Sequence, residues 1–86
     1  MIVLNKTMSK DPNIIFNKLK KFFKTEFKKN LNKNTKIISG GLIDSLDLLK
    51  LVSFLEKEFK IKISETDFVK KNFDNVNNLI KFIKKK

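Results

Sequence analysis

Apolar residues recur at the three- and four-residue spacing of amphipathic helices in three segments of this chain. The first segment follows Asp11-Pro12, a pair in which aspartate caps a helix and proline occupies its first turn. The second runs from about Asp44 to Phe59, and the third follows Asp74, which we expect to cap the last helix. The apolar positions of the three segments are, in order, Ile15, Phe16, Leu19, Phe22, Phe23 and Phe27; Leu48, Leu51, Val52, Leu55 and Phe59; and Val76, Leu79, Ile80 and Ile83.

The stretches between these segments carry turn and capping signals. Ser64–Asp67 has the composition of a helix start and predicts a short helix that contains Phe68 and Val69. Residues 36–38 and 60–63 alternate apolar and polar side chains, but two strands this short would make only a marginal sheet. We therefore expect extended connections whose isoleucines fill the core.

The order of these elements predicts the fold class. Residues 1–10 show no periodicity and are expected to form a flexible lead, which leaves residues 11–86 as a single domain. A polar stretch at 30–34 and a loop at 35–41, which contains both glycines of the chain, separate the first two helices. The expected fold is all-α, a small four-helix bundle of three longer helices and one short helix, with a long loop between the first and second helices.

The chain has a net charge of +11, and residues 1–40 contain ten lysines against two acidic residues. Such a basic segment permits an alternative function, a basic helical module that binds nucleic acid or an anionic membrane through the lysine-rich first helix. Every basic residue is lysine, however, and the chain lacks the planar guanidinium preferred for phosphate and guanine contacts. We expect no nucleic-acid partner and interpret the lysine excess mainly as solvated surface.

The residue types that are missing exclude several classes of function. The chain has no cysteine and no histidine, so it has no thiolate nucleophile, no His-based triad, no zinc cluster and no disulfide. We expect neither an enzyme nor a metal site. No apolar run approaches about 18 residues, and Met1–Leu4 is too short for a signal sequence, so we expect a cytoplasmic protein without a membrane span.

One serine occupies the start of the second helix. Asp44 is the expected cap, and Asp47, three residues later, can complete a capping box. Ser45 then lies in the first turn, where the positive end of the helix favours a covalently attached phosphate group. Leu46 points away from the apolar stripe, so we expect it to be exposed beside the hydroxyl. By the local pattern alone, Ser45 is either a modification site or part of an ordinary cap in an inert helical adaptor.

The segment Gly41–Asp47, of sequence GLIDSLD, resembles the attachment site of the acyl carrier proteins. The resemblance extends from about Asp11 to Ile83. Within it, residues 61–64 and 72–76 are similar to stand-alone carriers of specialised biosynthetic or aminoacyl-transferring pathways, rather than to fatty-acid synthase carriers. The resemblance implies a helical carrier that has no catalytic activity of its own.

The resemblance also implies a cofactor and a set of partners. Ser45 would carry a 4′-phosphopantetheine arm, with Asp44 and Leu46 beside it, and the thiol of the arm would hold acyl or aminoacyl groups as thioesters. A magnesium-dependent phosphopantetheinyl transferase would move the arm from coenzyme A to the serine. An acyl- or aminoacyl-activating ligase would then load the thiol, and downstream acyl-transferring enzymes would receive the cargo. We expect the carrier to act as a monomer.

The second helix departs from the fatty-acid carriers on its exposed side. That side is mostly acidic in those carriers, whereas this chain has Lys50 and Lys57 there, with Ser53 between them. We expect a dedicated partner with an acidic or neutral surface, unless these lysines are simply solvated. The residues expected to contact partners are Leu46, Asp47, Leu49, Lys50, Ser53 and Lys57.

Overall fold

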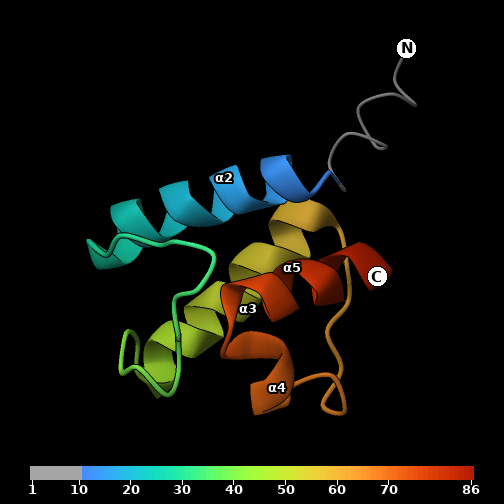
Figure 1. Cartoon of the computed structure of the whole chain (residues 1–86). Coiled ribbons are helices and arrows are strands. Elements are labelled where there is room, and N and C mark those ends of the chain that lie inside the picture. Colours follow the sequence, from blue (N-terminus) through green and yellow to red (C-terminus); the bar gives the residue numbers. More distant parts are fainter. Residues whose placement is uncertain (1–10) are drawn as a thin grey trace.

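A computed structural model describes residues 11–86, which form four α-helices and one π-helical turn (Figure 1). The elements are, in chain order, α2 (Pro12–Phe22), η1 (Phe23–Phe27), α3 (Ser45–Phe59), α4 (Lys70–Phe73) and α5 (Val76–Lys85). The helical class is confirmed: within the described part of the chain there is no strand, and of the four α-helices only α4 has fewer than ten residues. The flexible lead expected at residues 1–10 lies outside the described residues.

The first helix begins as its sequence predicts. The Asp11 carboxylate accepts a hydrogen bond from the backbone N–H of Asn13 at 2.8 Å, and Pro12 occupies the first turn. The helix continues into η1, which ends at Lys28 in a left-handed conformation, with φ of 58°. The N–H groups of Lys28 and Lys29 donate to the Lys24 and Phe23 carbonyls, and the Lys28 ammonium donates to the Thr25 carbonyl at 3.3 Å, so these bonds close the last turn.

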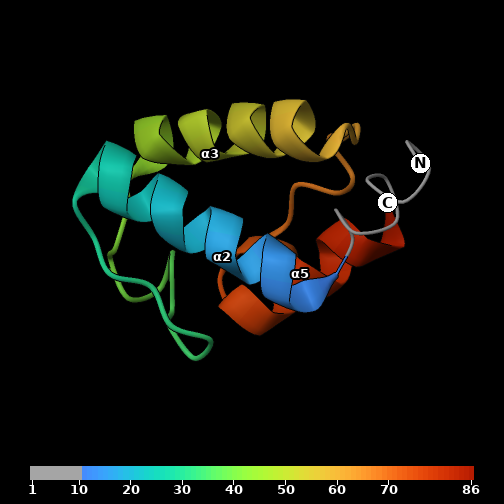
Figure 2. The ribbon, with the colours of Figure 1, turned by 90° about the horizontal axis from the view of Figure 1, so that it is seen from above.

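Helices α2 and α3 lie side by side and run in opposite directions (Figure 2). Phe22 of α2 stacks on Phe54 of α3, with ring centroids 4.1 Å apart and planes 15° apart. One turn further along, Lys18 forms an ion pair with Glu58, with 2.6 Å between Nζ and Oε2. The stacked rings supply the apolar contact between the two helices, because an exposed ion pair of this kind contributes little.

The buried core draws residues from all four helices, from η1 and from the connection 28–44. Ile37 is fully buried, which confirms the prediction that an isoleucine of this connection fills the core. Ile61 and Ile63 are partly buried and pack against the same cluster. Leu31, which no periodic pattern marks, is also buried. The complete set of buried residues is Ile15, Leu19, Phe23, Leu31, Ile37, Leu51, Leu55, Phe59, Phe73, Val76, Leu79, Ile80, Phe82 and Ile83.

The structure corrects the expected cap of the last helix. Asn75, not Asp74, caps α5, since its side-chain oxygen accepts hydrogen bonds from the N–H groups of Asn77 and Asn78 at 2.8 and 3.3 Å. Asp74 has helical backbone angles and ends α4. Its carboxylate turns instead to the connection 28–44 and accepts hydrogen bonds from the N–H groups of Ile38 and Ser39.

The structure also corrects the expected start of the short helix. Ser64–Asp67 forms a turn, in which the Asp67 carboxylate accepts from the N–H and the hydroxyl of Ser64 at 3.1 and 3.0 Å. Helix α4 begins only at Lys70. Phe68 and Val69 precede it and are 41% and 45% exposed. The aspartate therefore bonds back to its own turn, and the chain stays extended at Val69 before the helix begins.

Asp67 is expected to make the free energy of unfolding of the domain depend on pH in the acidic range. Its carboxylate lies 2.7 Å from Nζ of Lys86, and this contact, together with the Ser64 N–H, lowers the pKa of Asp67 to about 2. A depressed folded-state pKa stabilises the fold above the unfolded-state value and loses that contribution as the pH falls. We expect the free energy of unfolding to decrease from about pH 4 to about pH 2.

Urea unfolding followed by circular dichroism across this pH range checks this prediction. Asp67→Asn keeps the size of the side chain but cannot ionise, so its unfolding free energy should depend less steeply on pH than that of the unaltered chain. Equal slopes for the two proteins would show that Asp67 contributes nothing to acid sensitivity.

Candidate functional site

The start of α3 presents one free serine hydroxyl. Asp44 is extended and caps the helix, with its carboxylate accepting from the N–H of Asp47 at 2.9 Å. Ser45 is the first helical residue and is exposed. Its hydroxyl has no hydrogen-bond partner among residues 11–86. The return bond that would complete a capping box, donated by the Asp44 N–H to the Asp47 carboxylate, is not formed in this part of the chain.

The electrostatics of this helix end favour an attached anion. The unpaired N–H groups of the first turn carry a partial positive charge, and a phosphodiester on Ser45 would lie beside them. Only Asp47 places an acidic side chain in the first turn of α3. Within residues 11–86 no cluster of three or more potential metal ligands is present.

The connection before Asp44 forms turns that precede the exposed start of α3. The N–H groups of Gly41 and Leu42 donate to the Ile38 and Ile37 carbonyls at 3.0 and 3.1 Å. Gly41 has a φ of +70°, a backbone conformation that residues with a side chain rarely adopt. These bonds close the turns between the buried Ile37 and Leu42, and α3 begins at the exposed Ser45 three residues after Leu42.

The residues predicted to contact partners lie along α3, and most are exposed. Leu46 is 71% exposed, which confirms that it points away from the core, and Leu49 is 58% exposed. Lys50, Ser53 and Lys57 are also exposed, and Asp47 is half-buried at the first turn. We call the set of Leu46, Asp47, Leu49, Lys50, Ser53 and Lys57 the partner face.

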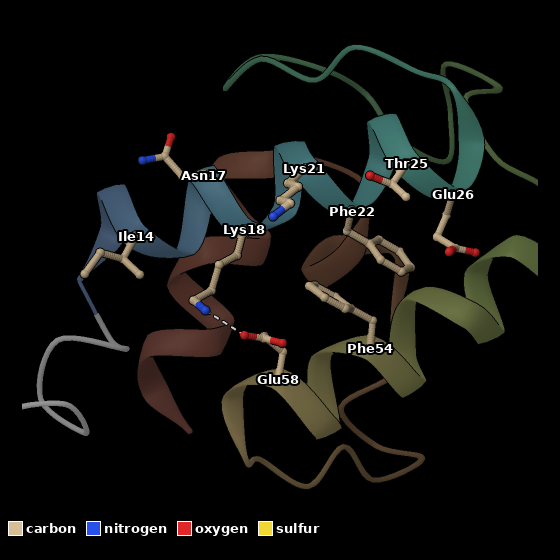
Figure 3. Close-up of a pocket in the computed structure, with 9 residues that line it drawn as sticks. All are labelled: Ile14, Asn17, Lys18, Lys21, Phe22, Thr25, Glu26, Phe54 and Glu58. Atoms are coloured by element: carbon tan, nitrogen blue, oxygen red, sulfur yellow. Dashed lines mark hydrogen bonds and ion pairs between the residues drawn. The ribbon is translucent and has the colours of Figure 1, made fainter. Parts of the chain in front are cut away.

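A groove between α2 and α3 adjoins the partner face. Its larger part, of about 520 Å³, is lined by the stacked Phe22 and Phe54 rings and bordered by the Lys18–Glu58 ion pair (Figure 3). A second hollow of about 400 Å³ continues from Phe22, Glu26 and Phe54 to four members of the partner face, Leu49, Lys50, Ser53 and Lys57. The partner face thus borders a hollow and also carries the charged side chains of Lys50 and Lys57.

Sequence reasoning missed the three residues that complete this hollow. Phe22 is assigned by its periodicity to the core, yet it is only partly buried. Glu26 is the single acidic residue of the lysine-rich first helix. Phe54 lies outside the apolar stripe of α3, and an aromatic residue away from its stripe is a sequence signal for such a contact.

Comparison with known protein families identifies the class. The family model described as a phosphopantetheine attachment site matches residues 18–83, which include α3 and Ser45. The chain therefore belongs to the phosphopantetheine-binding family of carrier proteins. No curated protein and no solved structure matches the chain significantly.

Membership of this family determines what the domain carries. A domain of this kind is the site of covalent 4′-phosphopantetheine attachment, and its members are carriers rather than catalysts. They interact with phosphopantetheinyl transferases and with biosynthetic enzymes. The match does not favour the alternative of a basic module for nucleic acid or membrane. No described helix has the length and apolar character needed to cross a membrane.

Proposed function

We propose that Ser45 is the attachment residue and that this chain presents acyl or aminoacyl groups, as thioesters on its arm, to a series of enzymes. The observation that carries the proposal is the exposed hydroxyl at the first turn of α3, without a partner among residues 11–86, within the matched family region. We also propose that residues 11–86 form the functional unit, because α2 contributes buried Ile15 ahead of that region, and that this unit acts as a monomer.

The attachment step is a phosphoryl transfer from coenzyme A. The Ser45 oxygen forms a bond to the phosphorus that bears the pantetheine arm, and the pyrophosphate P–O bond breaks. The adenosine bisphosphate half of coenzyme A leaves with the bonding electrons, and the hydroxyl proton is released. The Asp44 carboxylate accepts a hydrogen bond from the Asp47 N–H, which holds the backbone of the first turn of α3, from which the Ser45 hydroxyl projects.

The test uses the whole chain, produced without the arm. It is incubated with coenzyme A, Mg²⁺ and a phosphopantetheinyl transferase of broad specificity, and its intact mass is measured. We expect the mass to increase by one phosphopantetheine arm. No increase, with a known carrier modified in parallel, would contradict the proposal. Candidate acyl- and aminoacyl-activating ligases, offered the modified chain, would then identify the cargo.

We propose further that the partner face contacts the loading ligase and that its lysines select the partner. Both lysines of this face, Lys50 and Lys57, are exposed beside the hollow that Leu49 and Phe54 line. A partner that inserts an apolar side chain there and surrounds it with carboxylates would complement the charge. This arrangement, together with the resemblance of residues 61–64 and 72–76, favours a specialised pathway over fatty-acid synthesis.

Reversal of charge on the partner face tests this proposal. We expect Lys50→Glu/Lys57→Glu to slow loading by its ligase roughly tenfold at low salt, since exposed charges mainly change association rates, and less at high salt. The matched control is Lys71→Glu/Lys81→Glu, which makes the same change of charge on α4 and α5. Equal loading rates for the unaltered chain and the α3 variant would show that these lysines are only solvated.

A further inference from the structure

Asp74 joins two parts of the chain that are distant in sequence. It lies between α4 and α5, and one carboxylate oxygen, Oδ1, accepts hydrogen bonds from the N–H groups of Ile38 and Ser39 at 2.7 and 2.8 Å. Its backbone carbonyl accepts a third hydrogen bond, from the N–H of Ile37. The next residue, Asn75, forms an isolated antiparallel bridge with Lys36. Asp74 therefore accepts hydrogen bonds from three consecutive backbone N–H groups of the connection 28–44.

The bound segment has little freedom to move. The Ile37 side chain is fully buried below it. Gly40 passes so close to the Lys36 carbonyl oxygen that a Cβ atom at this position would overlap it. The N–H of Gly41 then donates to the Ile38 carbonyl at 3.0 Å. Residues 36–42 thus have one defined conformation, and they lead directly to the cap of α3.

The charge of Asp74 strengthens these bonds. Donation from the Ser39 N–H, and then from the Ile38 N–H, lowers the pKa of the Asp74 carboxyl, so the group is ionised at neutral pH. Hydrogen bonds to a carboxylate are roughly twice as strong as bonds between neutral groups. Asp74 is otherwise unexplained by the fold, because Asn75 provides the cap of α5.

We propose that Asp74 is a positioning residue for phosphopantetheine transfer, which fixes residues 36–42 in the conformation that a transferase meets beside Ser45. The proposal rests on Ser45 as the attachment residue. The segment precedes Asp44 closely in the chain and is exposed at Ser39, Gly40 and Gly41, so it offers surface to an enzyme that docks at the helix start. A segment that is already ordered costs the transferase no ordering entropy on docking.

Removal of the carboxylate should therefore act on docking more than on chemistry. If the segment without Asp74 adopts the docking conformation about a tenth of the time, the apparent affinity of the transferase falls about tenfold. We expect Asp74→Ala to raise the KM of the transferase for this chain by roughly that factor and to leave kcat unchanged. Amide hydrogen exchange at Ile38 and Ser39 should accelerate in the same variant.

Three further variants separate positioning from stability. Asp74→Asn keeps the Oδ1 acceptor that receives both hydrogen bonds, so it should restore KM to within a few-fold of the unaltered chain. Asp67→Ala removes a carboxylate that also binds backbone N–H, but in another turn, and should leave KM unchanged. Gly40→Ala places a Cβ atom against the Lys36 carbonyl oxygen and so disturbs the same segment without changing Asp74. It should also raise KM, and it tests the proposal if Asp74→Ala does not fold.

The outcomes distinguish this inference from the proposed function. If Ser45→Ala is still modified, the attachment site itself is wrong. If Ser45 is the attachment residue but Asp74→Ala and Gly40→Ala, measured at a temperature at which both are folded, keep the KM of the unaltered chain, the positioning role is wrong. An equal rise in KM for Asp67→Ala would also overturn it, because the effect would then follow from general loss of stability.

Discussion

Replacement of Ser45 by alanine is expected to abolish attachment of the phosphopantetheine arm and to leave the fold intact. The hydroxyl is exposed and has no hydrogen-bond partner among residues 11–86, so its loss removes no internal contact. Asp44 still caps the helix in the variant. We expect the free energy of unfolding to change by less than about 0.5 kcal/mol, as for other surface substitutions. Intact mass and urea unfolding measure the two effects separately.

Ser53→Ala is the matched control for this experiment. Ser53 is also exposed on α3, but it lies two turns beyond the helix start, away from the positive end of the helix. It should gain the arm as the unaltered chain does. A Ser45→Ala variant that still gains the mass of one arm would place the attachment site at another hydroxyl.

Replacement of Phe23 by alanine is expected to have the largest effect on stability. The Phe23 ring is fully buried and packs edge-to-face against Phe22 and Phe27, with ring centroids 6.0 and 5.2 Å apart. Truncation of a buried phenylalanine costs about 3 to 5 kcal/mol, through lost burial and the cavity left behind. A chain of this length has a total stability of only about 5 to 10 kcal/mol. We expect the variant to be partly unfolded in mild urea, as measured by circular dichroism.

Phe16→Ala provides the comparison within the same helical region. The Phe16 ring is only partly buried, and the ammonium groups of Lys20 and Lys33 lie 5.3 and 5.6 Å from its centroid. Its loss removes less buried area and two weak cation–π contacts, so we expect a cost of about 1 kcal/mol. Equal destabilisation by the two substitutions would contradict the burial that distinguishes these residues.

Much of the fold is predictable from local sequence because helix formation is decided within a few residues. The spacing of apolar positions places α2, α3 and α5, and Asp11 and Asp44 cap the first two helices as their sequence context predicts. The same periodicity predicts the exposure of Leu46. The candidate serine follows from the cap, since the residue after an N-cap lies in the first turn whatever the rest of the chain does.

The errors occur where two side chains compete for one local role. Asp74 and Asn75 are both good caps, and local sequence does not decide between them. Contacts with Ile38 and Ser39, about 36 residues away, decide which of the two residues caps α5. Their N–H groups donate to the Asp74 carboxylate, which leaves Asn75 as the cap. In the same way, Asp67 pairs with Lys86 and closes its own turn instead of starting a helix.

The sequence by itself determined which segments become the three longer helices, which serine stands at the start of α3 and, through the family match over residues 18–83, that the domain carries phosphopantetheine. Only the tertiary structure decided that the stacked Phe22 and Phe54 rings line a hollow beside the partner face. It also decided that Asp74 binds the segment that precedes the start of α3. Helix signals and caps act between residues within one turn of each other, whereas the stack and the Asp74 contacts join residues more than 30 positions apart.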